Sequence, residues 1–286
     1  NLCSNQYKKK ILFTICYIPG GIVGDLKFFD KGFFKIIKDL FNSKFIYIRA
    51  DFVKLKSESD KKSLENCNWS KPYYKMNNEI YISVDLSKSN QEILKDAKQK
   101  WRYHYKKSLS QELICELQEN PNADYIVKVN EELSRRNNVR NIYQSREINS
   151  WIDSLKDKLL VTTIFNKKKE ILGVRSSVVV DKVAWHNFSG VNQKGRDTLA
   201  GYQLLFFMFD VCRSKGIKKI NLGELNFENW PGPYRFKNGL YKSSIIFSSL
   251  GEWEWSNFVL LKNIINFSIN IYLKSNLFLS KIIKNL

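Results

Sequence analysis

The chain is poor in histidine, and its cysteines do not follow a metal-binding spacing. Only two of its 286 residues are histidine, and none of the five cysteines forms a C-x-x-C pair. Zinc sites need clusters of such ligands, so we expect no metal centre. An odd number of scattered cysteines also argues against a disulfide framework and favours reduced thiols, which are typical of a cytoplasmic protein.

Long apolar runs and acidic residues are scarce as well. No stretch of 18 uncharged apolar residues occurs, so we expect no transmembrane helix, and no signal peptide is evident before Pro19. Asp and Glu total 28 against 47 for Lys and Arg, which gives a formal net charge of +19. Such a surface attracts nucleic acid, anionic lipid or phosphorylated substrates. Codon bias toward lysine remains the alternative explanation of the charge.

The residues that are present indicate a folded α/β protein. Hydrophobic residues make up 43% of the chain, enough to bury a core in one large domain or two ordinary ones. Apolar patterns predict strands at 8–19, 44–52 and 79–86 and a helix at 31–43. Residues 53–78 are polar with a few aromatics, and we interpret them as a long loop.

A capping box predicts where the next helix begins. Ser89 and Glu92 have the spacing in which each side chain caps the other's backbone amide. The following helix, running through Trp101, carries a basic face that is either solvated or directed at phosphates. A second helix is predicted from about 122 to 135.

The second half has a different order of elements. Strands at 158–166, 171–180 and 183–190, joined by short polar turns, indicate an antiparallel meander. A largely apolar helix at 199–216, which Gly216 can end, is followed by a strand at 217–225. Residues 241–255 then supply one or two more strands, as in a hairpin.

This order resembles the GNAT acyltransferase fold, in which the acyl donor lies between two separating strands. GNAT enzymes that use coenzyme A carry R/Q-x-x-G-x-G/A before the buried helix, where backbone amides hold the pyrophosphate. Here Gln193 and Arg196 are followed by the wrong glycine spacing. The mismatch weakens a coenzyme A donor without excluding it.

Five stretches of the chain, within roughly residues 10–255, form a recognisable series of weak motifs. They are CYIPGGIVGD (16–25), SVDLSKSNQEILKDAKQKWRYHYKKS (83–108), ELSRRNNVRNIY (132–143), VAWHNFSG (183–190) and KKINLGELNFENWPGPYRFKNGLY (218–241). In this order they resemble the motifs of the FemABX family, whose members add amino acids from aminoacyl-tRNA to peptidoglycan precursors. The proline that is usual in the first motif is replaced by Gly21, and Asn and Val replace the Gly and Phe of the third.

The resemblance implies a fold and a set of site residues. The fold would be α/β (α+β), with two tandem GNAT-like domains of mixed, mostly antiparallel sheets, the first domain being shortened. In the family's aromatic-Lys pair the lysine faces the reacting centre, and the matching positions are Phe236 and Lys237. A cation fixed there stabilises the negative charge that develops on an attacked carbonyl oxygen. Further residues are expected to bind substrate, namely Arg136, Arg140, Lys106, Arg235 and His186.

Each of these roles has a plainer alternative. Asn238-Gly239 is a favoured two-residue hairpin turn, in which Lys237 would merely flank the turn. His186 is either a general base or a structural histidine on a strand. Substrate-assisted proton transfer would need no protein base.

Three functions therefore remain open. The leading one is an aminoacyltransferase that forms an amide between aminoacyl-tRNA and a phosphorylated or lipid-linked cell-envelope precursor, with no resident cofactor. The second is an acyl-CoA-dependent N-acyltransferase acting on an amino sugar of a surface polysaccharide. The third is a catalytically silent, membrane-associated binding protein with the same fold.

The sequence divides into three expected segments. Residues 1–86 would form the partial first domain, and residues 87–255 the second domain, beginning with the basic helical segment. Residues 256–286 contain four lysines and no acidic residue. They predict one or two basic amphipathic helices, either peripheral at the inner face of the cell membrane or packed on the core.

Overall fold

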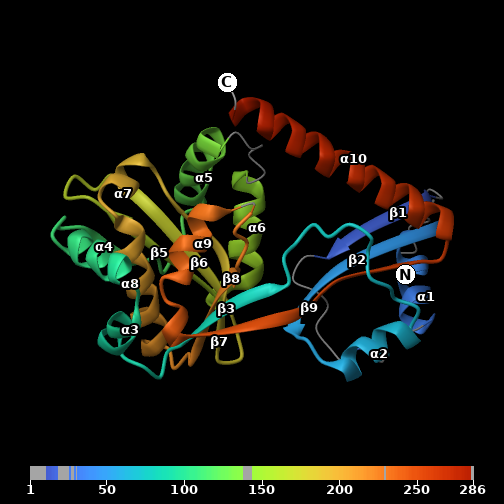
Figure 1. The fold of residues 1–286 in the computed structure, drawn as a ribbon, viewed down its shortest axis with the longest axis horizontal. Helices are drawn as coiled ribbons and strands as arrows, with labels where there is room; N and C mark the ends of the chain where they lie inside the picture. The colour runs from blue at the N-terminus through green and yellow to red at the C-terminus, as the bar shows by residue number, and fades with distance from the viewer. Residues whose placement is uncertain are drawn as a thin grey trace, which may run out of the picture. The chain divides into compact units, whose positions relative to one another are not determined.

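The chain folds into two compact units. The computed structural model describes residues 11–18, 26, 29, 31–137, 144–228 and 230–284, except the side chains of 11, 31, 137 and 273–284. One unit comprises residues 1–80 with 247–286, and the other comprises 81–246 (Figure 1). The units divide near residues 80 and 246, because the last strand pairs with a strand of the first unit. The expected segments 1–86, 87–255 and 256–286 stay a prediction about domains.

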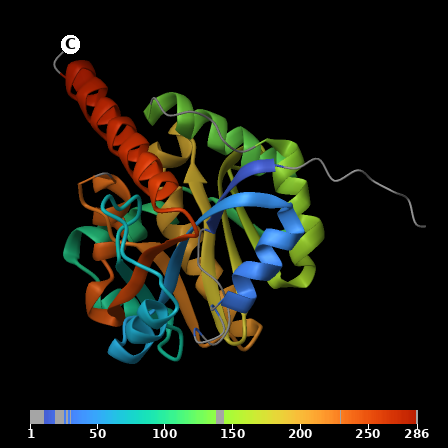
Figure 2. The same ribbon diagram turned by 90° about the vertical axis from the view of Figure 1, so that its right-hand side faces the viewer.

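The first unit is a small mixed sheet with helices. β1 (Ile11–Ile18) is parallel to β2 (Ser43–Leu55), and β2 is antiparallel to β9 (Ser244–Ser256). Figure 2 turns β1 and β2 toward the viewer, with α1 beside them. The helices of this unit are α1 (Lys31–Phe41), α2 (Glu58–Asn66) and α10 (Val259–Lys284).

The two faces of this sheet differ in chemistry. Alternate residues of β2, from Ile46 to Phe52, are apolar and buried in one core with Phe34 and Leu64 of the helices. The residues between them, such as Arg49, are buried on the opposite face, which is polar. Because successive side chains of a strand point to opposite faces, β2 contributes residues both to the apolar core and to the buried polar face.

Helix α2 corrects the expectation of a long loop at 53–78. Its first turn is capped by Ser57, whose hydroxyl accepts a hydrogen bond of 3.1 Å from the backbone of Asp60. Leu64 is fully buried on the inner side of this helix. The loop prediction was wrong because a single buried leucine and a good cap outweigh the polar composition.

The second unit is built on a larger sheet. Its strands are ordered β3-β8-β7-β6-β5-β4 and are antiparallel except for β7 with β8. The strands are β3 (Ile80–Asp85), β4 (Ile114–Leu117), β5 (Leu159–Phe165), β6 (Ile171–Val180), β7 (Val183–Val191) and β8 (Lys219–Glu224). The helices are α3 (Asn90–Asp96), α4 (Gln99–Leu109), α5 (Ala123–Asn137), α6 (Ser145–Leu155), α7 (Gln193–Asp197), α8 (Ala200–Ser214) and α9 (Pro231–Asn238).

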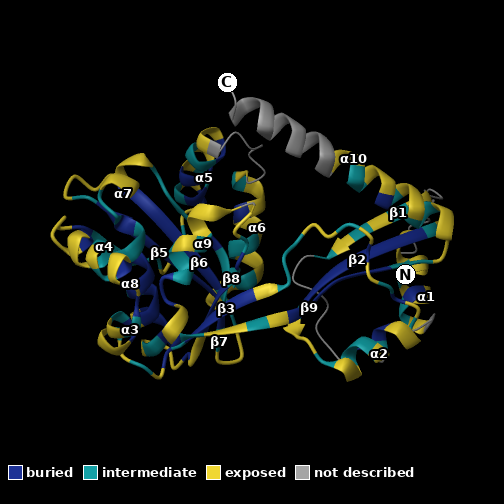
Figure 3. Cartoon of the chain, in the orientation of Figure 1, coloured by how far each residue is buried: buried dark blue, intermediate teal, exposed yellow. Residues whose placement is uncertain are grey.

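Helices cover both faces of this sheet. Leu160 of β5 is buried in a core with residues of α3, α4 and α8, whereas its neighbour Val161 is buried in a core with residues of α5 and α6. In Figure 3 the buried residues follow the sheet and the inner sides of these helices. The predicted meander and the buried helix that Gly216 ends at a φ of +70° are confirmed. The mixed, mostly antiparallel α/β fold is confirmed as well.

One local prediction beside this sheet was wrong. The helix expected to continue through Trp101 is broken at Ala97, whose ψ is 152°, and α4 begins after Lys98. The Lys98 amide instead donates a 2.9 Å hydrogen bond to the carbonyl of Gly239. The capping box of Ser89 and Glu92 is confirmed.

The segment expected as a hairpin at 241–255 is a single strand, β9. It bends rather than reverses, because Gly251 has a φ of +68° and the pairing with β2 shifts register between Phe52 and Leu55. The C-terminal segment is helical, as predicted, and α10 is one uninterrupted helix in Figures 1 and 2. Within the described part of the chain, no helix combines the length and the apolar character needed to cross a bilayer.

Candidate functional site

Two neighbouring strands of the second unit separate partway along their length. β7 and β8 run parallel, and the last of their paired positions joins Trp185 to Asn221. Beyond this pair β7 continues to Val191 and β8 to Glu224. Backbone and side-chain groups in the separated part are left for other partners. The candidate site lies where the two strands part.

His186 is the first residue of β7 beyond the pairing, and it lies beside a β-bulge. On β6, Ser177 pairs with His186 while Ser176 pairs with Phe188, so Asn187 is an extra residue. Such bulges redirect side chains and are frequent next to active sites. The buried Nδ1 of His186 has no hydrogen-bond partner among the described residues. Burial, with smaller contributions from two nearby cations, holds the pKa of His186 well below its ordinary value.

Gly223 marks the opposite side of the gap between the strands. Its φ is +85°, a region that favours glycine. A Cβ on this residue would lie 3.3 Å from His186 Cδ2 and 3.4 Å from Lys237 Nζ. The absent side chain therefore leaves the space in which the histidine ring and the lysine ammonium approach β8.

The lysine reaches this space from α9. Pro231 occupies the first turn of that helix, where its fixed φ suits helix initiation. The other end is held by Trp101, whose indole Nε1 donates a 3.1 Å hydrogen bond to the Phe236 carbonyl. A Cβ at Gly239 would overlap the same indole. Because α9 is fixed at both ends, the position of Lys237 is set by its surroundings rather than by a turn.

The turn alternative for Asn238-Gly239 is thus wrong. Lys237 lies in the last turn of α9, and its Nζ donates a 2.9 Å hydrogen bond to the backbone carbonyl of Glu224. The carbonyl itself is neutral, and the negative charge of Glu224 offsets the ammonium only in part. Burial, with a smaller effect from Arg175, lowers the pKa of Lys237 to about 8. The ammonium therefore persists at neutral pH and is close to losing its proton.

Arg175 of β6 supplies a second buried cation. Arg175 is only 7% exposed, and its Nε has no hydrogen-bond partner among the described residues. Burial lowers the pKa of Arg175 to about 10, so it also stays charged at pH 7. Two cations held with little water are costly for folding, and such groups concentrate at functional sites. The arrangement favours a negative charge that forms between them during a reaction.

The structure places the sequence-predicted residues in different surroundings. Lys237 and His186 come together beside Gly223, while Phe236 points into an aromatic cluster with Trp101 and Tyr202, at ring centroid distances of 5.9 and 5.0 Å. Phe236 therefore anchors α9. Of the remaining predicted residues, three lie on the surface, namely Lys106 on α4, Arg235 on α9 and Arg136 on α5, and Arg140 lies outside the described residues.

Arg175 escaped the sequence analysis, although a signal existed. It is the one charged residue within the strand sequence ILGVRSSVVV of β6. A buried strand seldom carries an arginine, because an unpaired guanidinium is expensive to remove from water. A lone cation in an otherwise apolar strand was the clue to a functional role.

The turn before α8, where GNAT enzymes hold a pyrophosphate, is occupied by the chain's own groups. The backbone N–H of Gln193 donates to the carboxylate of Glu132, and that of Gly195 donates a 2.8 Å hydrogen bond to the Asn192 side chain. A carboxylate at this turn repels an incoming phosphate. Nearby, burial and then the charge of Arg196 lower the pKa of Arg136. Within the described residues no cluster of three or more potential metal ligands occurs.

The coupling between the two buried cations can be measured directly. Replacing Arg175 with methionine is expected to raise the pKa of Lys237 from its value of about 8, because a neighbouring positive charge is removed. The pKa should stay below the ordinary lysine value, since burial persists. A 13C NMR titration of protein labelled at lysine Cε checks this, with Lys237→Met to assign the signal. An unchanged midpoint would show that the two cations do not interact.

Comparisons with known proteins agree on the fold. Neither a scan against protein-family models nor a search of curated proteins found a match. Among solved structures, FemX matches with a TM-score of 0.70 at 12% identity, covering 90% of this chain and 84% of that one. L-PGS from Bacillus licheniformis matches with a TM-score of 0.51 at 11% identity, over 77% of this chain and 71% of that one.

A third structure is similar over most of its length. It is the C-terminal domain of an Agrobacterium fabrum protein described as a lysylphosphatidylglycerol synthetase, with a TM-score of 0.58 at 12% identity. The match covers 91% of this chain and 81% of that one. In its fold the chain therefore resembles FemX and the lysylphosphatidylglycerol synthetase domain.

Proposed function

We propose that the chain is an acyltransferase that forms an amide, moving an amino acid from aminoacyl-tRNA to an amine of a cell-envelope precursor. The observation that carries this proposal is the ammonium of the half-buried Lys237, with a pKa of about 8, held beside Gly223 where β7 and β8 separate. The buried guanidinium of Arg175 adds to it. The FemX-like fold supports the same reaction class.

The chemistry explains why a cation belongs there. The acceptor amine attacks the ester carbonyl carbon, a C–N bond forms, and the carbonyl oxygen becomes negative. When this intermediate collapses, the C–O bond to the tRNA ribose breaks, and the proton of the new ammonium passes to the leaving oxygen. A fixed ammonium near the carbonyl oxygen stabilises the intermediate more than the neutral ester. We assign this role to Lys237.

His186 would act in its neutral form. Its lowered pKa keeps the imidazole uncharged at pH 7, so one ring nitrogen accepts a hydrogen bond. That acceptor suits the N–H of an attacking amine. A positively charged imidazole would instead repel the amine's proton and crowd a third cation next to Arg175 and Lys237. We therefore assign His186 to orienting the acceptor.

Charge and the occupied turn favour tRNA over coenzyme A as the donor. The formal net charge of +19 suits a polyanionic donor and a phosphorylated acceptor. The exposed cations Lys106, Arg136 and Arg235 are proposed to contact phosphates. In contrast, the Gln193 amide that would face a pyrophosphate already binds Glu132. No resident cofactor is required by this reaction.

The donor can be identified by offering both kinds together. Purified protein is mixed with a full set of charged tRNAs, acetyl-CoA, and nucleotide- and lipid-linked precursors bearing a free amine. We expect the acceptor mass to rise by one amino-acid residue, and only when charged tRNA is present. Acetyl addition would contradict the donor assignment, and no mass change with any donor would favour a binding protein.

A further inference from the structure

Two polar side chains hold helix α10 to its own unit. Lys262 forms an ion pair of 3.3 Å with Glu254, and Asn266, only 9% exposed, donates 3.0 Å hydrogen bonds to the same carboxylate. Glu254 is itself buried and accepts a 2.8 Å hydrogen bond from Tyr47 on β2. Lys262 and Asn266 of α10 are thus held to their own unit by polar contacts.

The outer side of the same helix is apolar. Leu260, Ile264, Phe267 and Ile271 are 57%, 53%, 64% and 53% exposed. Their spacing of four, three and four residues places them in one narrow stripe of an α-helix. We call these four residues the α10 stripe. A surface helix normally keeps its apolar residues on the core, so the α10 stripe needs a separate partner.

The adjoining edge strand adds apolar surface on the same side of the sheet. Ile15 of β1 is the register partner of Tyr47, whose hydroxyl contacts Glu254 beneath α10. Ile15 therefore lies on the face that α10 covers. Phe13 and Tyr17, two residues to either side of Ile15, share that face and are 51% and 45% exposed. Figure 3 shows exposed residues along β1 and the described part of α10.

We infer that the α10 stripe docks this protein on an anionic bilayer surface. Besides Lys262, which pairs with Glu254, residues 256–286 carry lysines at 274, 281 and 284 and no acidic residue. A basic helix with an exposed apolar stripe lies in the interface of anionic membranes, where the stripe enters the acyl boundary and lysines meet headgroups. Aromatic side chains such as Phe13 and Tyr17 suit the same interface.

Charge argues against the other occupants of the stripe. A second copy of the chain would bring together two segments that each carry Lys274, Lys281 and Lys284 and no acidic residue of their own. Nucleic acid offers phosphates to the lysines but nothing to cover a stripe of leucine, isoleucine and phenylalanine. An anionic lipid surface satisfies both features. The inference stands independently of the transfer chemistry proposed above.

Vesicle co-sedimentation of the full chain tests this directly. The unmodified protein is expected to sediment with phosphatidylcholine vesicles that contain phosphatidylglycerol, and more weakly with pure phosphatidylcholine or at high salt, which screens the lysines. The triple variant Leu260→Ser, Ile264→Ser, Phe267→Ser is expected to lose at least about tenfold in binding, since each exposed side chain contributes by entering the membrane.

A matched variant separates the stripe from general surface hydrophobicity. Ile36 and Leu40 on α1 are 66% and 63% exposed in the same unit, so the double change to serine should leave vesicle binding unaltered. Circular dichroism and urea unfolding show that the variants stay folded. Equal binding of the stripe variant and the unmodified protein overturns the inference. So does a self-association, measured by analytical ultracentrifugation without lipid, that the stripe variant abolishes.

Discussion

Lys237→Met is expected to lower kcat/KM for amide formation by about 10²–10³-fold, the usual effect of removing one fixed donor to a developing oxyanion. The ammonium is held beside the parting strands by its bond to the Glu224 carbonyl, and methionine keeps the length of the side chain without its charge. The measurement is the steady-state rate of acceptor modification, followed by mass spectrometry, with the substrates that the donor experiment identifies.

The pH dependence of the unmodified protein should carry the same signature. Lys237 has a pKa of about 8, lowered mainly by burial, so its ammonium is lost as the pH rises through that value. We expect kcat/KM to fall on the alkaline side of about pH 8, and this limb to disappear in Lys237→Met. A limb that persists unchanged in the variant would assign it to another group.

Stability separates a catalytic from a structural role for this lysine. Because the folded-state pKa is lowered, the folded protein disfavours the charged lysine at every pH below the ordinary lysine value. The methionine variant should therefore be at least as stable as the unmodified protein at pH 7. Lys242→Met, at an exposed position shortly after α9, is the control and should retain full activity. Full activity of Lys237→Met, or its unfolding, would refute the oxyanion role.

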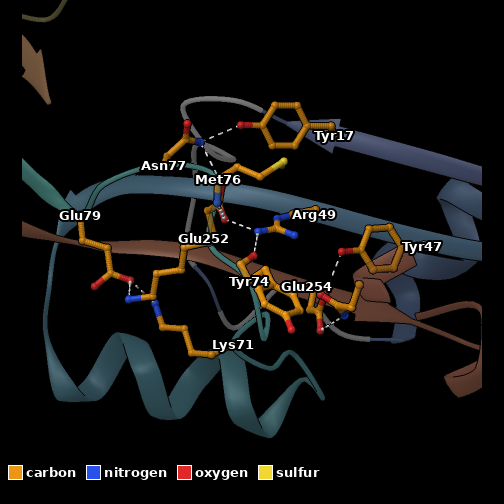
Figure 4. A network of polar contacts seen from close by, with 12 residues as sticks. Tyr17, Tyr47, Arg49, Lys71, Tyr74, Met76, Asn77, Glu79, Glu252 and Glu254 are labelled. Carbon is orange, nitrogen blue, oxygen red and sulfur yellow. Dashed lines mark hydrogen bonds and ion pairs between the residues drawn. The ribbon is translucent and has the colours of Figure 1, made fainter. Parts of the chain in front are cut away.

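Glu252→Gln is expected to destabilise the first unit by about 3–5 kcal/mol, the usual cost of removing one partner of a buried ion pair. Glu252 is 1% exposed and forms an ion pair with Arg49, which is equally buried (Figure 4). The carboxylate also accepts hydrogen bonds of 2.9 Å from the Met76 amide and 3.0 Å from the Asn77 side chain. The glutamine would leave the guanidinium charged and uncompensated.

Urea unfolding followed by tryptophan fluorescence measures this effect, since Trp253 and Trp69 are buried in the same unit. Glu79→Gln is the matched control, because Glu79 pairs with Lys71 and Lys75 at the surface of that unit. Exposed pairs contribute little, so the control should cost at most about 1 kcal/mol. Equal losses for the two variants would mean that the Arg49–Glu252 pair is not truly desolvated.

Much of the fold followed from local patterns. The alternating apolar segments of the meander, the apolar helix ended by Gly216 and the capping box at Ser89 each depend on residues close together in the chain. Their physical causes, side-chain periodicity and backbone capping, are visible in sequence. The prediction of a loop at 53–78 was wrong because helix α2 depends on the burial of Leu64, which no local pattern reveals.

Only part of the candidate site could be predicted from the sequence. A family resemblance pointed to Lys237 and His186, but the turn-forming pair Asn238-Gly239 equally favoured a hairpin. The helix formed instead because Trp101, far away in the chain, packs against Gly239 and binds the Phe236 carbonyl. Such long-range contacts override local turn preference.

The sequence by itself determined the charge, the α/β class and the residues available for chemistry. Only the tertiary structure decided which of them act together, because burial is a property of the packed chain. It is the closing of the sheet and helices around Arg175 and Lys237 that removes water from both cations and shifts their pKa values. The same is true of α10, where Lys262 and Asn266 contact Glu254 while the α10 stripe faces outward.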